Sequence, residues 1–139
     1  MYELVASQRL FRYQRNTKFG LDETENMLYQ MMMHAGAFFS AEQLQASPKA
    51  PEYFNADCNH LLLCSTLVNA HLYSSGLLKK NPTPINWPIK ARFDAIKMEM
   101  CDEDATATAS LIGRCLQLDP ADRPMSAELL NDDWFDGVE

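Results

Sequence analysis

The sequence predicts an all-α fold with long connecting loops and no sheet. Two observations support this fold class. Apolar residues recur at helical spacing along residues 27–32 and again along residues 105–118, which indicates amphipathic helices. No segment alternates apolar and polar residues as a half-buried strand does, and prolines interrupt the stretches between the helical segments. The chain is therefore expected to fold through packed helices.

Start and stop signals predict three helices in the first half of the chain, over residues 1–6, 22–35 and 41–46. The acidic run that begins at Asp22 favours a helix start, because carboxylates stabilise the positive end of the helix dipole. Gly36 is expected to end that helix, since glycine readily adopts the left-handed conformation found there. Ser40 is a typical N-cap for the third helix, which Ser47-Pro48 is expected to end.

Three more helices are predicted in the second half, over residues 89–100, 105–118 and 127–131. The stretch before them, residues 79–88, holds several X-Pro pairs that favour extended backbone, so it is expected to be a loop. Pro120 is expected to terminate the long helix and Ser126 to cap the last one. One face of the long helix is expected to be buried through Ala105, Ala109, Ile112 and Leu116.

The length and charge of the chain exclude several classes of protein. A chain of 139 residues suits a single domain, here residues 1–139. The net charge of −7 is unevenly distributed: residues 1–20 carry four basic and one acidic side chain, whereas residues 102–139 carry ten acidic and two basic ones. An acidic protein without a basic stripe is not expected to bind nucleic acid, because phosphate contacts supply most of that affinity.

The sequence predicts an intracellular protein, either cytoplasmic or nuclear, that does not insert into a membrane. Its first residues lack the pattern of a signal peptide, and its longest apolar run, residues 61–73, is too short to span a bilayer. The cysteines show no paired Cys-x-x-Cys spacing, so free thiols are expected, with Cys115 buried in its helix.

The most specific stretch of the chain lies in its last quarter. An apolar helix runs into Leu118-Asp119-Pro120, a short loop contains Arg123 followed by Pro-Met-Ser-Ala, and Glu-Leu-Leu leads to Trp134-Phe135. This order resembles the final two helices of the eukaryotic protein kinase fold. The resemblance implies structural positions for Asp119, Pro120, Arg123 and Trp134.

Arg123 allows two interpretations. In protein kinases the corresponding arginine forms a buried pair with the glutamate that ends the activation segment, and that glutamate would lie upstream of this chain. The alternative is a solvated loop arginine close to Asp119 and Asp122. Glu52 is not expected to replace that glutamate as a partner, and the two interpretations stay open at this point.

Three further segments resemble the kinase helical lobe in the expected order. Residues 2–11 are similar to the second half of its central helix and the exit from it. Residues 22–28 resemble the following helix of the SR-protein kinases, in the CMGC group, and residues 49–54 resemble the insert of that subgroup. The chain is thus expected to be a truncated kinase-like lobe that comprises the end of the central helix, the following helix, the CMGC-type insert and the last two helices. Residues 58–75 depart most from this pattern and are expected to be an atypical insertion.

The resemblance implies a serine/threonine kinase family that transfers a phosphoryl group from ATP, with magnesium, to protein hydroxyls. The sequence itself contains no glycine-rich phosphate loop, no Val-Ala-x-Lys, no His-Arg-Asp and no Asp-Phe-Gly. We therefore expect no catalytic residue and no cofactor in this chain, with ATP and magnesium relevant only to a full-length parent. The chain alone is predicted to be inactive.

Protein or basic peptide partners are the remaining expectation. In SR-protein kinases the helix that begins here at Asp22, together with the insert, forms an acidic groove for Arg-Ser substrates, so the resemblance implies peptide binding by Asp22, Glu23 and Glu25. A second hypothesis is a freestanding module that engages a kinase or a basic peptide, and a third is a fragment that does not fold alone. No metal is expected, because zinc sites usually show tighter ligand pairs than those of Cys58, His60, Cys64 and His71.

Overall fold

The computed structural model describes residues 2–55, 76–80, 87–96 and 100–135. These residues form seven α-helices and two short 3-10 helices, and the only β-structure among them is two isolated bridges, Asn16 with Leu21 and Phe54 with Leu78. The predicted all-α class is therefore confirmed for this part of the chain. The elements are α1 (Tyr2–Ala6), α2 (Glu23–Ala35), α3 (Ala41–Ala46), α4 (Ala50–Tyr53), α5 (Ile89–Ala95), α6 (Asp102–Cys115), η2 (Pro120–Asp122), α7 (Ser126–Leu130) and η3 (Asp133–Phe135).

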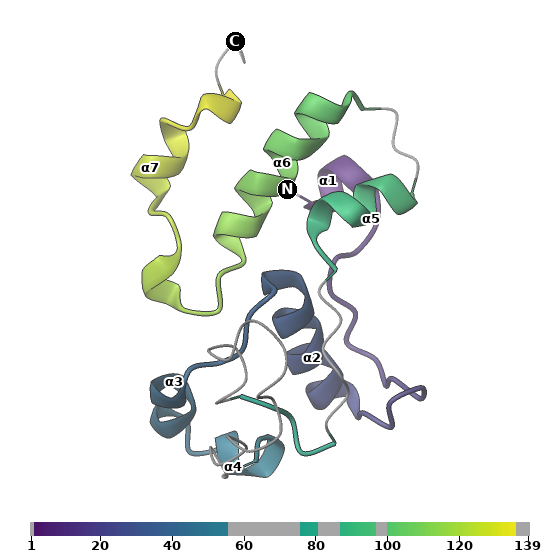
Figure 1. The fold of residues 1–139 in the computed structure, drawn as a ribbon, viewed down its shortest axis with the longest axis vertical. Coiled ribbons are helices and arrows are strands. Elements are labelled where there is room, and N and C mark those ends of the chain that lie inside the picture. Colours follow the sequence, from purple (N-terminus) through teal and green to yellow (C-terminus); the bar gives the residue numbers. More distant parts are fainter. Residues whose placement is uncertain (1, 56–75, 81–86, 97–99, 136–139) are drawn as a thin grey trace, which may run out of the picture.

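The helices form two groups, which Figure 1 shows one above the other. The upper group contains α1, α5, α6 and α7, and the lower group contains α2, α3 and α4. Each group has its own apolar cluster. The first cluster joins α1, α5 and α6 through Tyr2, Ala6, Leu10, Ile89, Phe93, Ala105 and Ile112. The second cluster gathers Leu21, Tyr29, Met32, Ala50, Phe54, Leu78 and Leu118 around α2.

Local sequence signals set the ends of α2 and α3 as predicted. Asp22 caps α2, and the carboxylate of Glu25 in turn accepts a hydrogen bond from the Asp22 backbone N–H at 2.8 Å. Gly36 ends the helix with a φ of 64°. Ser40 and Gln43 form the same reciprocal cap at the start of α3. Such caps satisfy N–H groups that have no partner inside the helix, so a few neighbouring residues suffice to specify them.

The structure corrects the predicted bounds of α6. The helix includes the acidic residues from Asp102 onward and ends at Cys115, three residues before the predicted end at Leu118. Pro120 therefore does not terminate α6; it opens η2 instead. The reason lies in the hydrogen bonds: the Leu116 N–H bonds to the carbonyls of both Ile112 and Gly113, which tightens the last turn.

Three other expectations also need correction. Ser126 lies inside α7 rather than at its cap, and the Met125 N–H bonds to the Glu128 carboxylate at 2.7 Å. The described part of α5 ends at Ala95, so it is shorter than predicted. Cys115, predicted to be buried, is an exposed free cysteine at the last position of α6.

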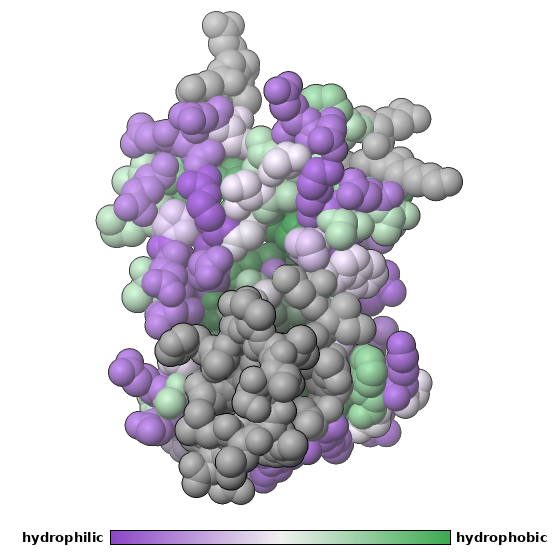
Figure 2. Space-filling model, viewed as in Figure 1, coloured by the Kyte–Doolittle hydropathy of each residue, from purple (hydrophilic) through white to green (hydrophobic). Residues whose placement is uncertain are grey.

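The C-terminal segment is tied to α6 by a small number of polar contacts. Trp134 donates its indole N–H to the hydroxyl of Thr108, which is buried, at 2.9 Å. Arg114 pairs with Asp132, and this hydrogen bond lowers the pKa of the Asp132 carboxyl. On the face shown in Figure 2, hydrophilic residues dominate the outer edge over η2 and α7. The acidic end of the described chain is thus a solvated surface.

Candidate functional site

One face of α2 buries polar side chains, which is unusual for a helix that also contributes to an apolar cluster. Asn26, Gln30 and His34 follow one another at intervals of one helical turn and are 5%, 9% and 5% exposed. They cover the irregular segment 11–16, whose backbone has few partners of its own. Since buried backbone N–H and C=O groups need hydrogen bonds, side chains from α2 can supply them.

Gln30 holds the backbone of Arg12 through two hydrogen bonds. Its Oε1 accepts from the Arg12 N–H and its Nε2 donates to the Arg12 carbonyl, both at 2.9 Å. Asn26 extends this arrangement by donating to the Gln14 carbonyl at 2.8 Å and accepting from the Asn16 amide at 3.2 Å. The backbone of the loop is therefore fixed against α2, while the side chains of Arg12, Tyr13 and Gln14 are exposed.

Replacing Gln30 with leucine is expected to lower the free energy of unfolding by about 1–2 kcal/mol, because the Arg12 N–H loses its protein partner and the Arg12 carbonyl keeps only the Gln14 N–H. Amide hydrogen exchange at residues 12–16 should accelerate more than exchange within α6. The matched control is Gln45→Leu, on the exposed surface of α3, which should leave both measurements nearly unchanged. Equal protection of residues 12–16 in wild type and Gln30→Leu would contradict the role of this clamp.

The three acidic residues expected to bind peptide all make contacts within the chain. Asp22 accepts from the Glu25 N–H at the start of α2. Glu23 pairs with Arg15 at 3.0 Å on the exposed surface. Glu25 is buried and pairs with Lys80 at 2.6 Å. Of the three, Glu23 is the one whose interaction is weak enough to exchange for another cation, because exposed ion pairs contribute little.

His34 connects the two groups of helices. Its Nε2 lies 3.2 Å from the Arg92 guanidinium of α5, and since arginine only donates, Nε2 accepts and the ring is neutral. Burial, followed by the positive charge of Arg92, lowers the pKa of His34 to about 4. Arg92 also donates to the Tyr2 hydroxyl at 3.2 Å and lies against the rings of Tyr2 and Trp87.

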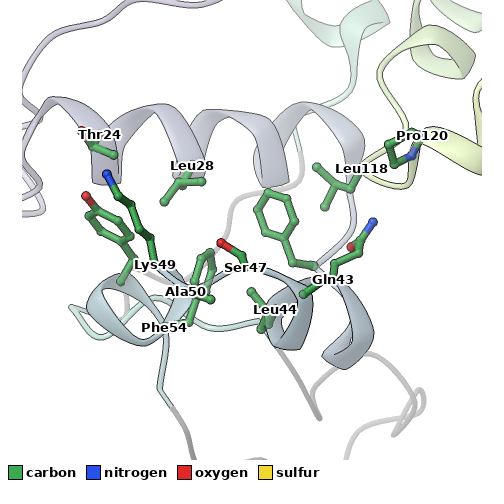
Figure 3. Close-up of a pocket in the computed structure, with 13 residues that line it drawn as sticks. Thr24, Leu28, Gln43, Leu44, Ser47, Lys49, Ala50, Phe54, Leu118 and Pro120 are labelled. Carbon is green, nitrogen blue, oxygen red and sulfur yellow. The ribbon is translucent and has the colours of Figure 1, made fainter.

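An apolar pocket of about 470 Å³ opens where α2, α3 and α4 meet (Figure 3). Thr24 and Leu28 point into it from α2, opposite Leu44 of α3. Leu118 and Pro120 close one end, and Lys49 and Ser47 place polar atoms among the lining residues. A mostly apolar hollow with a few polar groups is the usual form of a binding pocket.

The residues singled out in the C-terminal motif fall in two places: Asp119, Pro120 and Arg123 lie at η2, after the end of α6, whereas Trp134 contacts Thr108 within that helix. Arg123 is exposed, and its Nε donates to the Gln117 carbonyl at 2.7 Å, with a second, longer bond to the Leu118 carbonyl. Among the described residues it forms no ion pair with Asp119, Asp122 or Glu52. Asp119 instead caps η2 by accepting from the Ala121 N–H at 2.8 Å.

Residues 2–55, 76–80, 87–96 and 100–135 contain no group of three or more His, Cys, Asp and Glu side chains that could hold a metal ion. The proposed zinc ligands Cys58, His60, Cys64 and His71 and the atypical insertion lie outside the described residues. Within the described part, no helix is both long enough and apolar enough to cross a lipid bilayer.

Comparison with protein-family models, with curated proteins and with solved structures gave no match to this chain. The described residues define an all-α class with two apolar clusters. Sequence reasoning missed the polar face of α2, although the spacing of Asn26, Gln30 and His34 was a signal for it. The spacing places the three side chains on one face of the helix, and only the structure shows that this face is buried.

Proposed function

We propose that this chain is a non-catalytic part of a serine/threonine-kinase-like helical lobe and that it acts by binding a partner protein. The kinase relationship rests on the order of the sequence motifs, above all Leu118-Asp119-Pro120 and Arg123-Pro124 followed by Trp134-Phe135. The binding role rests on one observation, the apolar pocket between α2, α3 and α4. The pocket lies between α2 and the segment 49–54, whose sequences resemble the two parts that form the peptide-binding groove of the SR-protein kinases.

The chemistry of the pocket favours an apolar anchor from the partner. The lining is mostly apolar and includes Leu28, Phe39, Leu44, Phe54 and Leu118. A leucine-sized or aromatic side chain would therefore replace water against apolar surface. Glu23, close in sequence to Thr24 at the pocket, is the acidic residue best placed to attract a basic residue beside that anchor. A basic peptide with one large apolar residue is therefore the partner class that we propose.

The proposal includes the absence of catalysis. Phosphoryl transfer depends on positioning the phosphates and neutralising their charge, and the sequence lacks each motif that performs these tasks in protein kinases. Incubating the purified chain with radiolabelled ATP, magnesium and an Arg-Ser peptide is expected to give no transfer above a blank. Phosphoryl transfer above the blank that disappears when the chain is left out would overturn this part of the proposal.

Binding is tested by fluorescence anisotropy with two labelled Arg-Ser peptides, one of which carries a single leucine. The leucine peptide is expected to bind more tightly. Ala46 lines the pocket and is exposed, so Ala46→Glu should bind the leucine peptide about fivefold or more weakly than Gln45→Glu, because docking of the leucine takes the new carboxylate out of water at the apolar wall. Gln45→Glu adds the same charge next to the pocket without lining it and is the matched control.

Identical affinities of the two peptides, or identical effects of Ala46→Glu and Gln45→Glu, would rule out the apolar pocket as the docking site. Identical affinities of the two peptides, together with a loss of affinity in the Glu23→Gln variant, would instead favour purely electrostatic recognition of a basic segment.

A further inference from the structure

A second hollow, of about 430 Å³, lies on the loop that α2 clamps, and its lining is of a different kind. Its walls are polar or basic and contain no acidic side chain; they are made by Ser7, Gln8, Arg9, Arg12, Tyr13 and Gln14. All six residues carry hydrogen-bond donors in their side chains. In a chain with a net charge of −7, a hollow without a carboxylate and with two arginines is a local exception.

The two guanidinium groups are free to bind a ligand. Arg9 and Arg12 are both exposed, and neither side chain forms an ion pair or hydrogen bond within the described residues. Their neighbours on the same basic segment differ: Arg15 pairs with Glu23, and Lys18 lies over the ring of Phe19 at 5.2 Å. Only Arg9 and Arg12 of these four cations line the hollow.

The backbone that carries this hollow is fixed in place. Gln30 holds both backbone groups of Arg12, and Asn26 holds the carbonyl of Gln14. At the other side Ser7 turns the chain after α1 with a φ of 51°, a left-handed conformation that is costly for a residue other than glycine. Backbone held in this way limits the entropy lost on binding, which favours a preorganised site.

We propose that this hollow binds a phosphoryl group on a serine or threonine side chain of a partner protein. Two guanidinium groups match the phosphate monoester in charge, since it carries about −1.5 to −2 at neutral pH, whereas a single carboxylate uses one guanidinium fork. The Ser7 and Tyr13 hydroxyls and the Gln8 and Gln14 amides supply additional donors to its oxygens. The site is separate from the apolar pocket, so its success or failure is independent of the function proposed above.

Nucleic acid does not fit this surface. A strand would need a continuous row of available cations along its backbone, whereas only two unpaired cations line this hollow and the chain as a whole carries a net charge of −7. A single phosphoryl group needs no more than these two cations.

The test is a titration of the full chain with an uncharged Gly-Ala-Ser peptide that carries one phosphoserine. Three probes accompany it: the unphosphorylated peptide, the same peptide with glutamate in place of phosphoserine, and inorganic phosphate. Saturable binding of the phosphopeptide, at least about tenfold tighter than the glutamate peptide, is expected from the pairing of two guanidinium forks with one dianion. Binding of inorganic phosphate alone, without binding of the phosphopeptide, would refute a protein ligand.

Matched variants separate a specific site from general attraction. The double variant Arg9→Gln with Arg12→Gln should bind the phosphopeptide at least about tenfold more weakly than wild type. The control, Arg15→Gln with Lys18→Gln, removes the same charge from the same segment and should change the affinity by less than about twofold. Arg9→Lys with Arg12→Lys keeps the charge but not the bidentate geometry, and an intermediate loss is expected. Equal losses of affinity in the two double glutamine variants would show that the peptide is attracted by the general charge of the segment, and would overturn the proposal.

Discussion

Replacing Phe93 with alanine is expected to lower the free energy of unfolding by about 3–5 kcal/mol. Phe93 is 1% exposed and belongs to the cluster that joins α1, α5 and α6. Its ring stacks on Tyr2, with centroids 5.6 Å apart and an angle of 7° between the planes. The substitution removes the ring from both α1 and α6 at once and leaves a cavity that the short helices around it cannot close.

Urea denaturation followed by circular dichroism measures this loss. Because small domains are stable by only about 5–15 kcal/mol, the variant should unfold at a much lower urea concentration. The control is Leu130→Ala on α7, where the side chain is 77% exposed and the change should stay within about 0.5 kcal/mol. Similar midpoints for Phe93→Ala and wild type would show that α5 does not hold the upper group together.

Acidification from pH 6.5 to pH 4 is expected to reduce stability by about 3 kcal/mol through His34 alone. The folded state lowers the pKa of His34 from 6.5 to about 4, first because the ring is buried and second because the Arg92 guanidinium lies 3.2 Å from Nε2. Well above pH 6.5 the ring is neutral in both states and has no effect on stability. Between the two values the unfolded chain binds a proton that the folded chain does not, so stability decreases as the pH falls.

The measurement is the free energy of unfolding at pH 7, 5.5 and 4.5, compared between wild type and His34→Gln. The glutamine variant should lose less stability on acidification, because it has no group that titrates in this range at that position. The Asp132 carboxyl does not interfere, since its pKa lies below its ordinary value of 3.8 and its contribution is lost only at more acidic pH. Parallel pH curves for the two proteins would show that His34 is not the responsible group.

The ends of α2 and α3 could be predicted because their causes are local. Asp22 with Glu25, and Ser40 with Gln43, satisfy backbone groups within four residues of one another, and Gly36 supplies the left-handed residue that follows. The end of α6 could not be predicted in this way. Arg123 donates to the carbonyls of Gln117 and Leu118, beyond the last turn, and the apolar pattern continues to Leu118 although that residue packs with the lower cluster.

The candidate sites show the same division. That Arg9 and Arg12 are basic and near one another is plain from the sequence, and so is the acidic start of α2. Contacts between residues that are distant in sequence decided which of these charges remain available. Glu25 pairs with Lys80, 55 residues away. Gln30 holds the Arg12 backbone from 18 residues away, and the Arg12 side chain remains exposed. Periodicity does not report such pairings, because it describes one element at a time.

The sequence by itself determined that this chain forms helices, where the capped helices begin, and that the motifs of a catalytic kinase centre are missing from it. Only the tertiary structure decided which polar residues are buried, where α6 stops, and which surfaces are hollow and of what charge. The physical reason is that helix starts are satisfied by neighbours along the chain, whereas burial and pockets depend on residues that only folding brings together.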